Sequence, residues 1–172
     1  MASSVTERLA LGAALFGGLL AGVTANRALV QMPAWERIGV ISWASFTRAE
    51  NHGIGMIFYP VLGGAALFFT VAAAVAFRFD RKARGLRGAP IYAAAVLAVS
   101  WAVITRVVLV PALSSVGEAS TSAAELQRLF LNVARWSGIN DMLHALTFVA
   151  NLWALRELLS SPNGSPVASG RH

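Results

Sequence analysis

The residues best suited to do chemistry in this sequence are a histidine and a carboxylate three positions apart, His144 and Asp141. A neutral imidazole beside a carboxylate can accept or deliver a proton, and the carboxylate can fix the tautomer of the ring. A nearby arginine would stabilise the anion that proton removal creates, and the candidates are Arg106 and Arg27. The set predicts a proton-transfer site with His144 as the base and Asp141 as its orienter.

Further polar residues fall at the ends of the same apolar segments. Asn140 lies four positions before His144, so the two share one face of a helix. An ionisable group in the apolar zone of a membrane costs about 2.5 to 3.5 kcal/mol, so such groups face a pocket or a partner. We therefore expect the polar residues to meet at one mouth and to contact a substrate there. Besides the proton-transfer set, they are Arg27, Asn51, His52 and Asn140.

Each of these residues also has a purely structural interpretation. Arg27 and Arg106 lie close enough to span ends to extend to the outer head groups. Asp141 would favour the positive N-terminus of its helix, and His144 would hydrogen-bond across helices. His52 would lie at the membrane interface without a role. These interpretations stay open beside the chemical one.

Metal and cofactor sites are not expected. The chain has no cysteine, which excludes disulfides, iron–sulfur clusters and thiolate zinc sites. His52 and His144 would ligate haem or copper only at facing depths, and their expected depths differ by more than a helical turn. No nucleotide-binding or metalloprotease motif occurs. The predicted chemistry is therefore independent of a metal or cofactor.

The composition indicates that membrane-spanning helices position this chemistry. Of 172 residues, 56% are hydrophobic and 13% are charged, about half the charged share of an ordinary soluble domain. The formal net charge is +6, but the basic residues gather in the connector 78–87 and not on a folded basic face. Nucleic acid is therefore not an expected partner, and the lipid bilayer is.

Four segments are each long enough for a hydrocarbon core about 30 Å thick, which takes roughly 20 helical residues. They are about 8–31, 53–77, 89–110 and 138–159. Pro33 and Pro111 are expected to close the first and third spans. The pattern predicts an all-α bundle of four transmembrane helices over residues 1–159, and a polar, disordered cytoplasmic tail over 160–172.

The connector 78–87 holds five basic residues and one acidic residue. This charge places the connector and both termini in the cytoplasm of a multi-pass cell-membrane protein. One alternative is a signal peptide, because Leu9 to Val23 followed by Thr24-Ala25 resembles an apolar core with a cleavage site. Removal of residues 1–25 would leave three spans. Against it, Glu7 beside Arg8 makes a poor basic start.

The two halves of the chain share a layout: a span, a proline, an amphipathic piece and a second span. This layout favours two repeated helical hairpins. The amphipathic pieces begin near Pro33 and Ser122 and are expected at the outer surface. Their faces are compatible with docking to a second copy of the chain in a homo-oligomer. Glycines in the first two spans predict close helix packing. They are Gly12, Gly17, Gly18, Gly22, Gly63 and Gly64.

Three short stretches carry a family resemblance. They are Met32-Pro33-Ala34, Thr105 leading to Val110-Pro111-Ala112-Leu113, and Leu129 through Arg135-Trp136 into Ile139-Asn140. Over about residues 8 to 158 the chain resembles the anthrone-oxygenase-like family of small four-helix membrane proteins. Some members of that family oxidise anthrones to anthraquinones without metal or flavin. The resemblance implies an oxygenase-like role, with Trp136, Asn140 and His144 as matching candidates; Asp141 stands where a basic residue is usual.

Two functions follow from these patterns. The first is an enzyme that performs cofactor-independent oxidation or proton transfer on a lipophilic aromatic or quinone-like small molecule, in a pocket that opens outward. The second is a non-enzymatic small membrane subunit or partner-binding protein, whose polar cluster only holds helices together.

Overall fold

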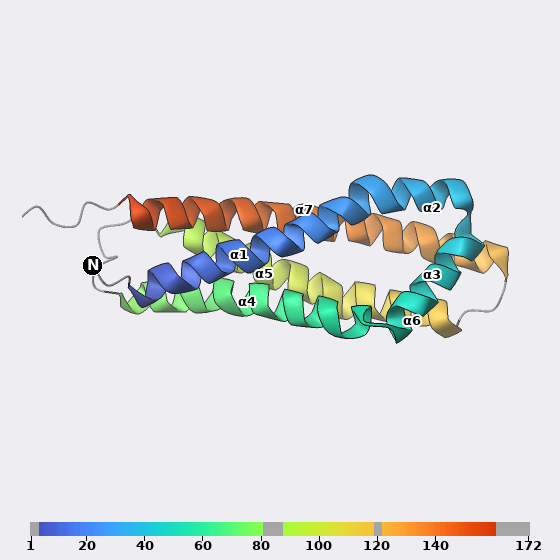
Figure 1. The fold of residues 1–172 in the computed structure, drawn as a ribbon, viewed down its shortest axis with the longest axis horizontal. Coiled ribbons are helices and arrows are strands. Elements are labelled where there is room, and N and C mark those ends of the chain that lie inside the picture. The colour runs from blue at the N-terminus through green and yellow to red at the C-terminus, as the bar shows by residue number, and fades with distance from the viewer. Residues whose placement is uncertain (1–3, 81–87, 119–121, 161–172) are drawn as a thin grey trace, which may run out of the picture.

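The computed structural model describes residues 4–80, 88–118 and 122–160, and in these ranges every regular element is a helix. Long helices lie side by side along one axis (Figure 1). The elements in chain order are α1 (Val5–Asn26), η1 (Arg27–Gln31), α2 (Met32–Ile38), α3 (Val40–His52), α4 (Gly55–Phe79), α5 (Ala89–Ile104), η3 (Thr105–Leu109), α6 (Val110–Glu118) and α7 (Ala123–Leu159).

Both ends of the described chain lie at the same end of the bundle, at the left of Figure 1. Here α1 and α5 begin and α4 and α7 end; we call it the terminal end, and the opposite one the distal end. α1 packs against α4 and α7, and α5 packs against the same two helices. At the terminal end the Thr6 hydroxyl donates to the Asp80 carboxylate at 2.9 Å, which joins the start of α1 to the end of α4.

Three helical stretches are long and apolar enough to cross a membrane: Val5–Ile38, Gly55–Phe79 and Ala89–Val116. The prediction of an all-α membrane protein is confirmed at this level. The predicted fourth span, 138–159, is the C-terminal part of α7. It is not among the three, because polar and charged residues such as Asp141, Asn151 and Arg156 interrupt its apolar sequence.

Pro33 and Pro111, which were expected to close two spans, do not end their helices. α1, η1 and α2 form one continuous helix through Pro33 to Ile38, where Gly39 turns the chain with a φ of 91°. In the same way α5, η3 and α6 continue through Pro111. Both helices therefore extend beyond the predicted span ends.

A π-helical turn precedes each proline. The N–H of Met32 bonds the carbonyl of Arg27, and the N–H of Val110 bonds that of Thr105, so both bonds reach five residues back. A proline ring lacks the N–H and clashes with the carbonyl four residues earlier. The wide turn changes the hydrogen-bond register just before the proline, which lets the helix continue.

α7 joins the second amphipathic piece and the fourth predicted span into one helix of 37 residues, with Ser122 at its N-cap. Heptad spacing, as in coiled coils, keeps one seam facing the neighbouring helices. The seam is apolar at both ends and polar in the middle. Its buried residues are Leu126, Phe130, Val133, Ser137, Asn140, His144, Thr147, Asn151, Ala154 and Leu158.

A separate apolar core closes the distal end. α3 crosses this end and buries Trp43 against Phe130 of α7, with ring centroids 5.2 Å apart and nearly perpendicular planes. Val116 of α6 is fully buried in the same core. Arg48 of α3 donates from Nε to the Val116 carbonyl at 3.0 Å. The predicted amphipathic pieces therefore pack on one another around a shared core.

Gly12 shows why small residues are needed between α1 and α4. A Cβ atom at position 12 would lie 2.6 Å from Cδ1 of Phe69, whose ring stacks on Phe16. The close-packing prediction is confirmed at Gly12, and also at Gly18, where a Cβ would lie 3.0 Å from Phe148. It is wrong at Gly22 and Gly64, where a Cβ would meet no atom within 4 Å.

We expect Gly12→Ala to lower the free energy of unfolding by about 1 to 3 kcal/mol, since an overpacked core must displace the Phe69 ring. Unfolding in dodecyl maltoside micelles would measure this loss. Gly22→Ala is the matched control: the same added methyl meets open space, and alanine favours a helix over glycine by about 1 kcal/mol. Equal losses in both variants would contradict this account of the α1–α4 contact.

Candidate functional site

A buried polar cluster forms where α7 faces the two π-helical turns. Arg27, the first residue of η1, donates from Nη2 to the Asp141 carboxylate in a salt bridge. Thr105, the first residue of η3, pairs with Asn140: the Asn140 Nδ2 donates to the Thr105 Oγ1 at 3.2 Å. Two neighbouring residues of α7 are therefore each held by the first residue of a π turn.

His144 lies within this cluster, one turn after Asn140. Its Nε2 is 3.1 Å from the Asn140 Nδ2. An amide nitrogen only donates, so Nε2 accepts and the neutral ring carries its proton on Nδ1. The Trp101 indole lies against the imidazole, with ring centroids 4.4 Å apart and planes tilted by 42°. Asn140, Asp141 and His144 are each at most 9% exposed.

The predicted pairing of Asp141 with His144 is not the one the structure forms. Asp141 binds Arg27, and His144 instead receives the Asn140 amide. A charge-assisted bond to a guanidinium is stronger than a bond to a neutral imidazole, which explains the choice of partner. Asn140 is therefore the residue that fixes the tautomer of His144.

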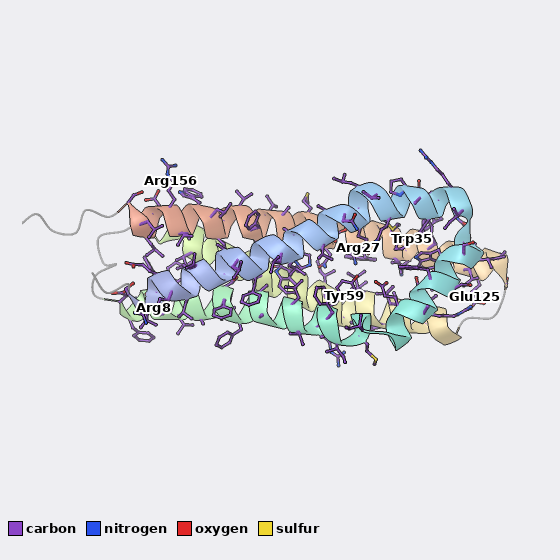
Figure 2. The ribbon with its side chains drawn as sticks, viewed as in Figure 1. Arg8, Arg27, Trp35, Tyr59, Glu125 and Arg156 are labelled. Carbon is purple, nitrogen blue, oxygen red and sulfur yellow. The ribbon has the colours of Figure 1, made fainter. Side chains whose placement is uncertain are left out.

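Arg27, and not Arg106, is the arginine of the cluster. The Arg106 side chain is exposed, whereas Arg27 binds Asp141. Arg27 is 30% exposed and lies midway along the bundle (Figure 2). Its Nε atom is buried and has no hydrogen-bond partner among the described residues. The cluster therefore contains one buried donor to which no described residue supplies an acceptor.

The level of the cluster along the bundle follows from helix length. Arg27 is 22 residues after Val5, and Asp141 is 18 residues before Leu159. At about 1.5 Å per residue these separations are about 33 Å and 27 Å from the terminal end. With the terminal end at one membrane face, the cluster lies near the opposite boundary of a hydrocarbon core about 30 Å thick.

The other predicted site residues are less closely engaged. Trp136 is half-buried on α7, one turn before Asn140. The side chains of Asn51 and His52 lie outside the described residues, although their backbone completes α3. The connector residues 81–87 and the tail after Ser160 also lie outside them.

The structure adds the partners of Asn151, a residue that the sequence places on the same helix stripe as Asn140 and His144. Deeper in the bundle, the Asn151 Nδ2 donates to the Thr70 Oγ1 at 3.1 Å and lies 3.5 Å from the Ala13 carbonyl. The Thr147 hydroxyl donates to the carbonyl of Leu143 on its own helix at 2.7 Å. The heptad spacing from His144 predicts the inward position of Thr147, whereas no sequence signal marks Thr70 as a partner.

A pocket of about 360 Å³ lies elsewhere, at the junction of α3 and α4, and no member of the cluster lines it. In the described parts of the chain, no three His, Asp or Glu side chains converge as a metal site requires. Comparisons of the chain with protein-family models, curated proteins and solved structures find no match. The function is therefore inferred from the geometry of the cluster.

Proposed function

We propose that this protein is a membrane enzyme that removes a proton from a lipophilic aromatic substrate and oxidises it without a bound cofactor. The observation that supports this is the hydrogen bond from the Asn140 amide to Nε2 of buried His144. This bond holds the imidazole neutral, with the lone pair of Nε2 directed at Asn140. The imidazole lies in the same cluster as the Arg27 guanidinium. A base and a cation held together suit a substrate that becomes an anion.

In this mechanism His144 takes the substrate proton at Nε2, after the substrate displaces the Asn140 amide. Rotation of that amide would present its Oδ1 to the protonated ring. Arg27, through the Nε for which no described residue is a partner, donates to the oxygen of the substrate anion. Trp101 supplies a flat apolar wall for an aromatic ring, and Asp141 holds Arg27 in place.

Dioxygen is the oxidant in this proposal. The electron-rich anion reacts with it, so that a ring CH₂ of the substrate becomes C=O. One oxygen atom enters the product, and the other leaves as water with the two hydrogens of the CH₂ group. Anthrones and related enol-forming aromatics are the substrate class, in keeping with the family resemblance described above.

We further propose four membrane crossings, with both termini in the cytoplasm and the cluster toward the outer leaflet. Basic residues at the terminal end support this orientation; they include Arg8 and Arg156, labelled in Figure 2, and Arg78 in the last turn of α4. The inward polar seam supports α7 as the fourth crossing. Two repeated hairpins are supported by the π turns, since Arg27 and Thr105 each lie six residues before a proline.

The proposal is tested with purified protein in phospholipid nanodiscs and anthrone as the probe. We expect the protein to accelerate oxygen uptake and quinone absorbance, with one dioxygen consumed per product. Under argon, it should still speed the loss of deuterium from a CD₂-labelled probe, because proton transfer precedes oxidation. Rates equal to those of empty nanodiscs in both assays would refute the proposal.

One observation favours the second function, a polar cluster that only fastens helices. Asn140 bonds both Thr105 and His144, and Arg27 bonds Asp141. Such bonds join α7 to both other helices of the cluster without any ligand, and interhelical polar contacts of this kind are worth about 0.6 to 2 kcal/mol each. Variants at His144 separate the two functions.

A further inference from the structure

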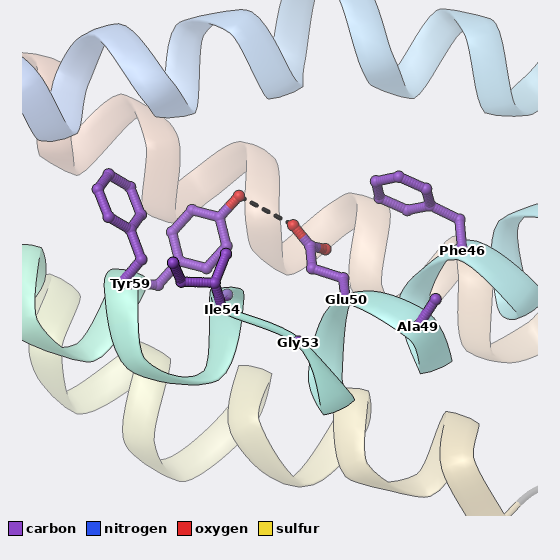
Figure 3. A pocket seen from close by; sticks show the side chains of 8 residues that line it. Phe46, Ala49, Glu50, Gly53, Ile54 and Tyr59 are labelled. Carbon is purple, nitrogen blue, oxygen red and sulfur yellow. Dashed lines mark hydrogen bonds between the residues drawn. The ribbon is translucent and has the colours of Figure 1, made fainter.

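The α3–α4 pocket combines aromatic rings with a carboxylate (Figure 3). Its walls include Phe46 and Glu50 of α3 and Phe58 and Tyr59 of α4. The three rings are each 41% to 49% exposed, so the pocket is open to ligands. None of these residues belongs to the buried polar cluster. The pocket is thus lined by other residues than the cluster, although the charge of Arg27 acts on Tyr59.

Glu50 is held in place within the pocket. The Tyr59 hydroxyl donates to its Oε1 at 2.9 Å, as the dashed line in Figure 3 marks. Gly55 makes this approach possible, since a Cβ there would lie 3.0 Å from the Glu50 Cγ and 3.3 Å from the Tyr59 Cε2. Among the described residues no lysine or arginine lines the pocket. The negative charge of Glu50 is therefore not neutralised from within the pocket.

The aromatic rings are also fixed by their neighbours. Phe46 packs on Trp35 of α2 with centroids 5.4 Å apart, and Phe58 packs on Tyr59 at 5.6 Å with planes at 73°. The face of an aromatic ring attracts a cation, and several rings around a carboxylate recognise an ammonium group. The residues of this pocket therefore match a positively charged, weakly hydrated head group.

The depth of the pocket indicates what the rest of the ligand is. Tyr59 is 20 residues before Phe79, which is about 30 Å from the terminal end. The pocket then lies at the head-group level of a bilayer whose hydrocarbon core is about 30 Å thick. From Ile57 beside the pocket, an exposed apolar stripe of α4 continues toward the terminal end through Val61 and Phe68, and all three residues are more than 60% exposed. An alkyl chain can follow this stripe into the hydrocarbon.

We propose that the α3–α4 pocket binds the ammonium head group of an amphiphile, with Glu50 as counter-ion and Phe46, Phe58 and Tyr59 as cation-binding rings. The alkyl chain lies along α4. The source of the head group is either an ammonium phospholipid of the bilayer or a free long-chain ammonium compound. This site does not depend on the proposed oxidation chemistry.

Calorimetric titration of the protein in dodecyl maltoside micelles with dodecyltrimethylammonium tests the proposal. We expect saturable binding at one site per chain, weakened about ten-fold or more in Glu50→Gln and about three-fold or more in Phe58→Leu. Glu36→Gln, which removes an exposed carboxylate of α2, is the matched control and should bind like the wild type. A neutral dodecyl amphiphile should not saturate the site. Equal affinities in Glu50→Gln and wild type, or equal binding of the neutral amphiphile, would overturn the proposal.

Two nanodisc compositions distinguish the sources. In phosphatidylcholine, a lipid head group in the pocket would compete with the probe and reduce the affinity ratio between wild type and Glu50→Gln. In phosphatidylglycerol the ratio would stay at its micelle value. Equal ratios in both compositions, both well above one, would identify a free ammonium amphiphile as the ligand. If wild type and Glu50→Gln bind the probe equally in both compositions, the proposed site is wrong. Far-UV circular dichroism confirms that the variants compared are folded.

Discussion

Turnover of an anthrone probe is expected to fall about 100-fold or more in His144→Gln, with the helical fold kept. Glutamine has a similar length and can still accept a hydrogen bond from Asn140, but it cannot take up a proton near neutral pH. Positioned general bases contribute about 10² to 10⁴ in rate. The measurements are kcat/KM for quinone formation and the rate of deuterium loss under argon. Both should fall together, because one group performs the proton transfer on which oxidation depends.

A second variant separates catalysis from fastening. Asn151 lies in the same polar seam but bonds Thr70 deeper in the bundle, so Asn151→Ala should lower the melting temperature and leave kcat/KM near the wild-type value. His144→Gln should show the reverse pattern. If His144→Gln melts earlier but turns over at the wild-type rate, the cluster only holds helices together.

Asp141→Asn is expected to cost about 3 to 5 kcal/mol of unfolding free energy, because it leaves the Arg27 guanidinium without its counter-charge in a low-dielectric site. Arg27 keeps 30% of its side chain exposed, so the lower part of this range is the relevant one. Unfolding of the protein in mixed detergent and dodecyl sulfate micelles would measure the loss. The effect concerns stability and does not require a substrate.

The double variant Arg27→Gln/Asp141→Asn provides the decisive comparison. It removes both charges, so it should be more stable than the sum of the single losses predicts, by about 1 to 3 kcal/mol. Arg106→Gln is the matched control: it removes the same charge from an exposed side chain of η3 and should cost no more than about 0.5 kcal/mol. Strictly additive single losses would contradict a coupled pair.

Apolar composition was sufficient to predict the helices, but not where they end. Long apolar runs have few folded alternatives in a bilayer, so the all-α class follows from hydropathy. Pro33 and Pro111 are local helix-breaking signals, and in water they would usually mark an end. Here a π turn absorbs each proline, and the sequence contains no separate mark for that turn.

The site was predictable where a helix has polar spacing of its own. Asn140 and His144 share a face of α7 because they are four residues apart, and the structure buries both. The choice between Arg27 and Arg106 was not predictable. Their helices are apolar on all sides, so periodicity marks no inward face, and only packing shows which arginine reaches Asp141.

The same limit explains the contacts of Trp101 and Thr70. Both belong to almost uniformly apolar helices, α5 and α4, and nothing in those sequences distinguishes an inward aromatic or hydroxyl from an outward one. The prediction that Asp141 pairs with His144 was wrong for a related reason. Spacing shows which side chains share a face of one helix, whereas hydrogen bonds also depend on the neighbouring helices.

The π turns also determine how the two proline-containing helices are phased. Each residue advances an α-helix by about 100°, so one extra residue in a turn rotates everything beyond it by about that angle. Trp35 and Val116 face the distal core only in this rotated frame. Deletion of one residue within 27–31, or within 105–109, would restore ordinary α-helical phase. The helix beyond the deletion would then rotate so that its buried face no longer packs against α3. At these two places the gene should tolerate substitutions far better than a change in its length.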